Sequence, residues 1–316
     1  MVQLFKDQLL GIGSYGAICK AKSGELLCAA KIINPNLLDP AMMYRIPDKQ
    51  QGESEDSERG KGERWTIIRW FEQESEFLFK LRHPNLLQYL GLCRDPHTGL
   101  PVILMELMVD NLTHYLRTPG PIPYHIQVNV CHDVAQALSF LHSSNIIHKN
   151  LCSNNVLLTN SDGAKVTDFG MATLADLNPL STPLPSAAIQ DKLAYMPPEA
   201  VKEYPIYTER MDSFSFGVII VQILTRRLPS PGDRLKYNRP GMPKDIATCT
   251  PVTEVERRRD HIDLIDQDHS LLPIALDCLK DKAIERPSAN QLCKRLAMLK
   301  EGSEYKKSVN STIKEL

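Results

Sequence analysis

The sequence predicts an α+β chain in which a β-rich region comes first and a helical region follows. Between residues 5 and 33, short apolar runs are interrupted by glycines and by the turn-like pair Ser23-Gly24, which is typical of three strands joined by tight turns. After residue 110, apolar residues recur at steps of three and four, which is the spacing of a buried helix face. The change of period indicates a small β-rich lobe followed by a larger helical lobe.

Length and composition exclude several classes of protein. The chain has 316 residues, and its 37 basic and 38 acidic residues give a net charge of −1, whereas a nucleic-acid-binding protein needs a basic excess. The longest aliphatic run, Val218–Val221, is far below the ~20 apolar residues that cross a bilayer. Lys6, Asp7 and Gln8 stand where a secretion signal needs apolar residues. The eight cysteines include no Cys-x-x-Cys pair, so we expect free thiols in a soluble, cytoplasmic protein.

The β-rich region contains an interruption that its composition sets apart. Residues 48–64 carry no large apolar side chain, so burial cannot offset the entropy of ordering them, and we expect a disordered insertion. Residues 65–81 then carry apolar side chains at helical spacing. Leu86–Leu92 and Val102–Met108 have the character of strands, so one helix accompanies the predicted sheet.

The helical region begins with a long buried helix, which the apolar series between Ile126 and Leu141 predicts. Two turn-rich connections, 172–190 and 228–250, interrupt the region, and residues 301–316 form a polar tail. Further helices are expected near residues 198–203, 212–225, 252–265, 269–280 and 288–299.

The glycines near the N-terminus follow the pattern G-x-G-x-x-G-x-V, with Gly11, Gly13 and Gly16 as the glycines and Ile18 as the last residue. A dinucleotide site needs a helix that starts at the third glycine, whereas residues 17–33 predict a hairpin. Because glycine has no Cβ, a hairpin loop of glycines lets backbone N–H groups approach phosphates. A purely structural tight turn is the alternative interpretation.

A lysine interrupts the apolar strand that follows. Lys31 lies within residues 28–33, so it is either an edge residue facing solvent or a buried cation that needs a partner. Glu74 lies at helical steps from the apolar residues of the 65–81 helix and projects from the same face. An ion pair between Lys31 and Glu74 would satisfy both charges and direct the ammonium at a ligand phosphate. The alternative is that Glu74 is a solvated residue at the flank of that face.

With Asp168-Phe169-Gly170 and Pro197-Pro198-Glu199 added, the chain resembles the eukaryotic protein kinase family, within its tyrosine-kinase-like group. The resemblance runs from about residue 5 to 300 and keeps the order and spacing of the motifs. It implies a bilobal protein-kinase fold that binds ATP and Mg²⁺ in the cleft. The implied boundaries are an N-lobe of 5–107, a hinge of 106–110 and a C-lobe of 111–300.

The resemblance also implies roles for particular residues. Lys31 and Glu74 match the strand lysine and the helix glutamate, Met105 matches the gatekeeper, and Glu106 to Met108 match the hinge that hydrogen-bonds adenine. Asn155 and Asp168 match the two magnesium ligands. Asp212 matches the anchor of the large lobe, and Arg286 matches the arginine that pairs with Glu199. The implied cofactor-binding set is Gly11, Gly13, Gly16, Ile18, Ala29, Lys31, Met105, Glu106, Met108 and Leu157.

The catalytic loop departs from the family pattern. It reads His148-Lys149-Asn150, where the family has His-Arg-Asp, and an amide cannot take a proton near neutral pH. Cys152 stands where serine/threonine kinases usually have a lysine, and Lys192 replaces a hydroxyl residue. The groups that match ATP and magnesium binding are retained, so the changes gather where the acceptor hydroxyl would be handled.

Four functions follow as hypotheses. The first is a nucleotide-responsive pseudokinase in intracellular signalling, which binds ATP and Mg²⁺ and whose conformation a protein partner reads. The second is an active protein kinase, serine/threonine rather than tyrosine, that transfers the γ-phosphate to a protein substrate despite Asn150. The third is an unrelated dinucleotide enzyme, which the hairpin disfavours, and the fourth is a structural module with an empty cleft. No nucleic acid and no membrane span are expected.

Overall fold

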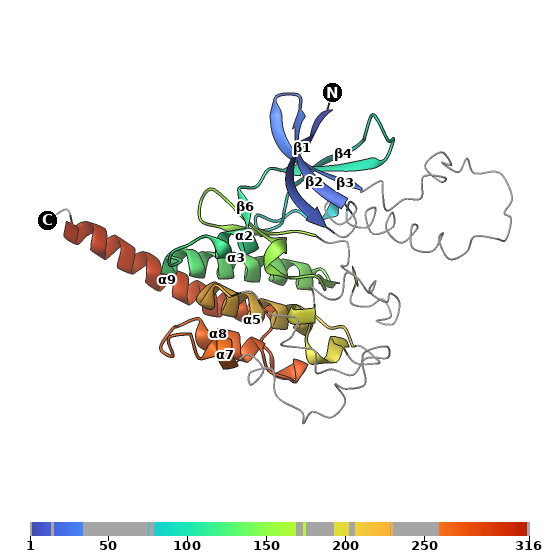
Figure 1. Cartoon of the computed structure of the whole chain (residues 1–316). Coiled ribbons are helices and arrows are strands. Elements are labelled where there is room, and N and C mark those ends of the chain that lie inside the picture. Colours follow the sequence, from blue (N-terminus) through green and yellow to red (C-terminus); the bar gives the residue numbers. More distant parts are fainter. Residues whose placement is uncertain are drawn as a thin grey trace. The chain divides into compact units, whose positions relative to one another are not determined.

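The chain divides into two units in the computed structural model, Met1–Arg82 with Leu87–Met108 and His83–Leu86 with Val109–Leu316. The first unit holds a β-sheet and the second is mainly helical (Figure 1), which confirms the predicted α+β fold class. The predicted insertion lies outside the described residues, as do most of residues 65–81 and nearly all of the two turn-rich connections. The structure describes residues 2–13, 16–33, 75, 79–168, 173–174, 193–201, 206–227, 229 and 259–314.

The first unit is built on an antiparallel sheet of five strands in the order β1-β2-β3-β5-β4. The three strands predicted between residues 5 and 33 are present, and Gly24 joins the last two with a φ of +60°, a conformation that glycine adopts without strain. The strands are β1 (Val2–Gly13), β2 (Gly16–Ser23), β3 (Leu26–Ile33), β4 (Tyr89–Arg94) and β5 (Pro101–Glu106).

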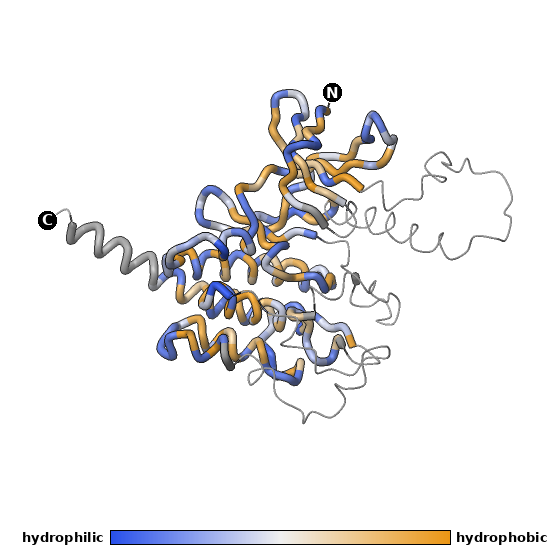
Figure 2. The backbone as a smooth tube through the Cα atoms, in the orientation of Figure 1, coloured by the Kyte–Doolittle hydropathy of each residue, from blue (hydrophilic) through white to orange (hydrophobic). Residues whose placement is uncertain are grey.

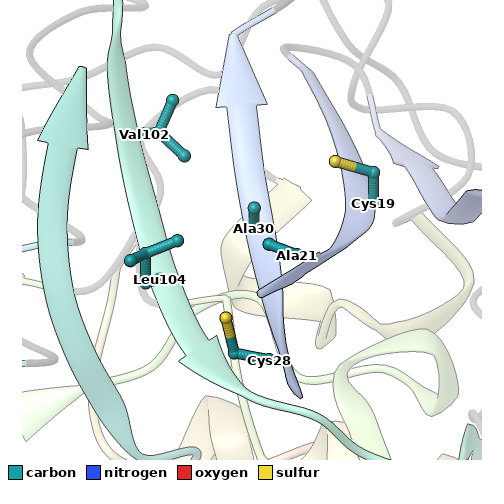
Figure 3. Packing of buried hydrophobic residues seen from close by; sticks show 6 residues of the cluster. All are labelled: Cys19, Ala21, Cys28, Ala30, Val102 and Leu104. Carbon is teal, nitrogen blue, oxygen red and sulfur yellow. The ribbon is translucent and has the colours of Figure 1, made fainter. Parts of the chain in front are cut away.

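One face of this sheet carries a cluster of small buried side chains, shown in Figure 3. Alternate residues of a strand point to the same face, and the register places Cys19 opposite Ala30 and Ala21 opposite Cys28. Partly buried residues, Leu4 and Ile32 among them, pack against the cluster. We call it the small-residue cluster; its members are Cys19, Ala21, Cys28, Ala30, Val102 and Leu104.

The strand predicted over residues 86–92 is shifted in the structure. β4 begins only at Tyr89, because Leu86 instead forms a bridge with Val166 in the second unit. Asn85 reinforces this attachment: its side-chain amide donates to the backbone oxygen of Ala164 over 3.2 Å. The shift depends on a partner about 80 residues away, so local apolar character could not reveal it.

The second unit combines short strands with helices. β8 lies between β6 and β9 in a three-stranded sheet, and β7 pairs with β10. The strands are β6 (Asp110–Asn111), β7 (Ile146–Ile147), β8 (Val156–Leu158), β9 (Ala164–Val166) and β10 (Thr173–Leu174). The helices are α2 (Leu112–Arg117), α3 (Tyr124–Ser143), α5 (Arg210–Thr225), α7 (Arg259–Ile262), α8 (Leu272–Cys278) and α9 (Ala289–Lys314). Short 3₁₀ turns occur at Ser153–Asn155, Leu193–Tyr195, Pro198–Val201 and Ala283–Glu285.

Two helices form the centre of the second unit. α3 is the long helix expected from its apolar spacing, and it packs against α9; Figure 2 shows hydrophobic and hydrophilic residues alternating along it. α5 is buried on all sides from Met211 to Ile223, and its central residues, Phe216 to Val221, carry no polar side chain, as expected for a helix in the interior. Among the described residues, no helix combines the length and hydropathy that crossing a bilayer requires.

Two expected helices differ from their predicted extent. In the segment near 198–203, the described residues Pro198–Val201 form a 3₁₀ turn and not an α-helix, and residues 202 and 203 lie outside the described part of the chain. The helix expected to end at 299 continues as α9 to Lys314, because the polar tail contains no proline and several residues that favour helices. Only Arg259–Ile262 of the helix expected over 252–265 lies among the described residues as helix.

The close approach of α5 and α8 makes Gly217 a test of the packing. A Cβ at Gly217 would lie 2.6 Å from the Cβ of Cys278 and 3.2 Å from the backbone oxygen of Ala275. We therefore expect Gly217→Ala to lower the free energy of unfolding by about 1–3 kcal/mol in urea titrations.

Gly302→Ala is the matched control, because a Cβ there meets nothing within 4 Å on helix α9. It should raise the free energy of unfolding by up to about 1 kcal/mol. Equal stability of the two variants would contradict this account of the α5–α8 contact.

Candidate functional site

In the first unit, four of the predicted nucleotide-binding residues share one face of the sheet. Ile18 lies opposite Lys31 in the register, and Ala29 lies opposite Met105. Alternate residues of a strand point to opposite faces, so Ala29 and Lys31 lie on the face away from the small-residue cluster. The sheet thus gathers four residues of the predicted set that are up to 87 positions apart in the chain.

Lys31 places a charge on an otherwise apolar face. Its neighbours across the strands are Ile18 and Ile103, and Ile103 is fully buried. An ammonium in such surroundings needs an anionic partner. Glu74 lies outside the described residues, so the ion pair between Lys31 and Glu74 stays a prediction.

Different structural constraints favour glycine at the separate positions of the loop. A Cβ at Gly16 would lie 2.1 Å from the backbone oxygen of Ile32, so the packing requires glycine there. A Cβ at Gly11 would meet nothing within 4 Å, so neither packing nor backbone strain explains this glycine. The open space lets a ligand approach the backbone. Gly13 ends β1, and the two following residues lie outside the described part of the chain.

The predicted hinge residues follow β5. Met105, at the gatekeeper position, is buried. Glu106 is fixed by Gln88: its backbone N–H donates to the oxygen of Gln88 over 3.0 Å, and its carboxylate accepts from the N–H of Gln88 over 2.6 Å. Met108 is half-buried and ends the first unit.

In the second unit, a buried carboxylate holds the predicted catalytic loop. Asp212, on α5, accepts hydrogen bonds from His142 Nε2 over 2.8 Å and from the backbone N–H groups of His148 and Lys149 over 2.9 and 3.0 Å. Burial by itself would raise the pKa of Asp212, but the hydrogen bonds from His142 and the His148 backbone outweigh it and hold the pKa below its ordinary value. Asp212 therefore stays ionised and fixes the start of the loop.

His148 continues the network in one defined tautomer. Its Nε2 lies 3.0 Å from the backbone oxygen of Thr167, which can only accept, and its Nδ1 lies 3.2 Å from the backbone N–H of Asn150, which can only donate. The proton must therefore be on Nε2, and Nδ1 is the acceptor. His148 thus ties the catalytic loop to the residue before Asp168.

Three predicted site residues meet at the end of this network. Asn150 Nδ2 donates to Asp168 Oδ2 in a short contact, and Asn155 Nδ2 donates to the same oxygen over 3.3 Å. Asn155 Nδ2 also donates to the backbone oxygen of Asn150 over 2.7 Å. Leu157, the remaining predicted residue of this unit, lies half-buried on β8.

The donor set at this place fits magnesium. The Asp168 carboxylate and the Asn155 carboxamide supply hard oxygen atoms, which Mg²⁺ prefers, and their hydrogen bond places both side chains together. Within the described residues, no group of three His, Cys, Asp or Glu side chains forms a metal site. Asp168 and Asn155 are therefore the residues that would hold the ion, with further oxygens coming from a ligand or water.

The ammonium group of Lys149 lies over an aromatic ring. Its ammonium lies 4.4 Å from the ring centroid of Tyr207, which is within the range of a cation–π interaction. Burial lowers the pKa of Lys149 to about 8, and the Asp212 carboxylate acts in the opposite direction. The backbone of Lys149 has a φ of +62°, which its hydrogen bond to Asp212 helps to maintain.

Some contributors to the site could not be found in the sequence. His142 is the residue before the last one of α3, and its partner Asp212 lies 70 positions later. Ser153 hydrogen-bonds Thr113 over 2.6 Å and Tyr195 over 2.9 Å, and burial raises the pKa of Tyr195 to about 12. These hydroxyl groups carry no motif of their own, and only the fold brings them together.

The ion pair expected between Arg286 and Glu199 is confirmed. Arg286 is buried, and its two terminal nitrogens donate to the two carboxylate oxygens of Glu199 over 2.6 and 2.9 Å. The guanidinium also donates to the backbone oxygens of Lys280 and Asp281. Because both charges are paired and hydrogen-bonded, burial is tolerated and the segment around Glu199 is fixed to the helical unit.

Comparisons with known proteins match one family over most of the chain. The model of the family described as protein tyrosine and serine/threonine kinase matches residues 61–296. The chain is 28% identical over 296 residues to "Probable serine/threonine-protein kinase kinX" of Dictyostelium discoideum, which covers 92% of this chain and 23% of the relative. It is 28% identical over 303 residues to "Serine/threonine-protein kinase VIK" of Arabidopsis thaliana, which covers 93% of this chain and 59% of the relative. The chain thus spans less than two thirds of the length of these relatives.

The environment of Lys149 predicts a pH dependence of stability. Its pKa is about 8 in the folded protein and 10.5 ordinarily, so between these values Lys149 binds more protons in the unfolded chain, and its contribution to the free energy of unfolding rises with pH. Buried cysteine thiols with a raised pKa, Cys131 and Cys278 among them, contribute in the opposite direction. Lys149→Met should therefore make the slope of the free energy of unfolding against pH more negative than in the unchanged protein, measured by urea unfolding between pH 7.5 and 10.5.

Lys294→Met, at an exposed position of α9, is the matched control and should keep the slope of the unchanged protein. An equal slope in the Lys149→Met variant would show that Lys149 does not contribute to it.

Proposed function

The chain belongs to the protein tyrosine and serine/threonine kinase family, and we propose that it is a nucleotide-responsive pseudokinase that binds ATP and Mg²⁺ and transfers phosphate slowly at most. One observation carries this proposal. At the position of the catalytic aspartate, Asn150 is buried and its amide donates to Asp168, while Asn155 and Asp168 keep the oxygen donors of a magnesium site.

The nucleotide half of the proposal rests on the first unit and on Asp168. Ile18, Ala29 and Met105 offer an apolar face for a base, and Lys31 offers a charge for a phosphate on the same face. The open space beside Gly11 suits a closely approaching phosphate. When bound at Asp168 and Asn155, Mg²⁺ supplies positive charge that offsets the charge of the phosphates.

The transfer half of the proposal rests on what Asn150 can do. Its Nδ2 is committed to Asp168, and its Oδ1 is buried from solvent. An amide cannot accept the proton of an acceptor hydroxyl, and loss of a general base costs ~10²–10⁴-fold in rate. A kinase turnover of roughly 1–100 per second would then fall to about 10⁻⁴–1 per second.

An active serine/threonine kinase is the second candidate. The relatives named as serine/threonine kinases favour it, and positioning and electrostatics supply most of the catalysis in this family. In this case Asn155 and Asp168 would still orient the nucleotide and the missing base would be compensated. The two candidate functions imply different protein partners: a substrate for the active kinase, and a regulated protein for the pseudokinase.

Nucleotide binding is tested by thermal and urea unfolding with and without ATP and Mg²⁺. At a ligand concentration 100-fold above the dissociation constant, ATP should stabilise the protein by about 2.7 kcal/mol. Lys31→Met should lose most of this gain, whereas Lys22→Met should keep it, because Lys22 is paired with Glu25 at the exposed end of β2. Absence of any stabilisation at millimolar ATP would refute nucleotide binding.

Phosphate transfer is tested with radiolabelled ATP and purified protein. We expect turnover below about 1 per second for the unchanged chain, an increase for Asn150→Asp, and loss of activity for Asp168→Ala. Turnover of tens per second without any substitution would decide for the active kinase. It would also show that Asn150 does not limit transfer.

A further inference from the structure

We propose that Asn150 is a positioning residue for Asp168. Its amide holds the Asp168 carboxylate, a role that a metal ion would otherwise have, and it competes with divalent cations for one carboxylate oxygen. Nucleotide binding by this chain would then depend only weakly on Mg²⁺. That consequence rests on the proposed function, whereas the competition itself concerns the second unit alone and needs no nucleotide.

The contacts concentrate on one oxygen atom. Asp168 Oδ2 accepts from the carboxamide nitrogens of both Asn150 and Asn155. The second carboxamide is held in turn, because it also donates to the backbone oxygen of Asn150 over 2.7 Å. Hydrogen bonds to a carboxylate are stronger than those between neutral groups, so the two amides stabilise the position of Asp168 in the absence of a metal ion.

The orientation of the Asn150 amide follows from its surroundings. Turning the amide over would put its oxygen against the Asp168 carboxylate, where two acceptors repel each other. The nitrogen therefore faces Asp168. In consequence, Asn150 Oδ1 is buried and has no hydrogen-bond partner among the described residues. Leaving a buried acceptor unpaired is unfavourable, so the bond to Asp168 is the interaction that decides the orientation.

The backbone at Asp168 needs such support. Its φ of +68° lies in the left-handed region, which residues other than glycine adopt rarely and only when the surroundings enforce it. The preceding residue, Thr167, is fixed by His148 Nε2 at its oxygen and by the oxygen of Asn155 at its N–H, both over 3.0 Å. With the backbone held on one side and the carboxylate on the other, Asp168 is ordered before any ion binds.

The same contacts oppose metal binding. A cation that coordinates Asp168 Oδ2 must displace the N–H groups that already occupy its lone pairs. An aspartate at position 150 would have the reverse effect, because it donates no N–H group and adds a second negative charge beside Asp168. Two carboxylates at this distance repel each other unless a cation lies between them. Asn150→Asp should therefore convert a site with weak metal dependence into one that requires a metal.

The competition is measured on the nucleotide-free chain by titrating Mn²⁺ and following the free ion by electron paramagnetic resonance. Replacing one charge-assisted hydrogen bond by a carboxylate ligand corresponds to at least a tenfold change in affinity. We expect Asn150→Asp to bind Mn²⁺ at least tenfold more tightly than the unchanged protein. Asn154→Asp, which adds the same charge at the exposed neighbouring asparagine, should differ from the unchanged protein by less than threefold.

Equal Mn²⁺ affinity of the unchanged protein and Asn150→Asp would overturn the proposal, as would an equal gain in Asn154→Asp. Should Asn150→Asp fail to fold without metal, Asn150→Ala serves instead, because it removes the donor and adds no charge. The alanine variant should melt at a lower temperature in EDTA and recover more on adding Mg²⁺ than the unchanged protein does. An Asn150→Ala variant that responds to Mg²⁺ like the unchanged protein contradicts the proposal.

Binding of ATP in EDTA and in Mg²⁺ tests the consequence for nucleotide. We expect less than a threefold difference in dissociation constant for the unchanged chain and more than a tenfold difference for Asn150→Asp. A tenfold requirement for Mg²⁺ in the unchanged chain would refute weak metal dependence. If no ATP binds under either condition, the proposed function fails, and the Mn²⁺ titration alone decides whether Asn150 competes for Asp168.

Discussion

The arrangement of the second unit depends on one buried carboxylate. Asp212 lies on the buried helix α5 and stays ionised because His142 and two backbone N–H groups donate to it. A buried charge is stable only when such donors surround it, so the chain can satisfy Asp212 only by bringing the end of α3 and the catalytic loop together. The left-handed backbone at Lys149 is one local consequence.

The hydrogen-bond network continues from Asp212 through His148 toward Asp168. His148 uses both ring nitrogens, one toward Asn150 and one toward Thr167. The loop therefore arrives at Asp168 with two amide groups facing the carboxylate. Exchanging aspartate for asparagine changes little in volume, yet it replaces an acceptor by a donor at the centre of the site. The electrostatic character of the site thus follows from one amide.

Only part of the site could be predicted from the sequence, because many of its contacts join residues that are distant in the chain. The kinase family was identified correctly, and the pairing of Arg286 with Glu199 followed from the resemblance. Asn150 was noticed because it interrupts a motif, but its bond to Asp168 was not foreseen. The role of His142 and the link of Ser153 to Tyr195 were missed, because single polar residues in a buried helix or a loop give no sign of partners 40 to 70 positions away.

The sequence by itself determined the elements whose signal is local. Short apolar runs broken by glycines predicted β1 to β3, and apolar spacing predicted α3 and α5, because period and turn chemistry act over a few residues. Only the tertiary structure decided where β4 begins, which face carries Lys31, and which atom of Asp168 meets Asn150. Register, hydrogen-bond direction and the burial of charge depend on partners distant in the chain, and these exist only after the chain has folded.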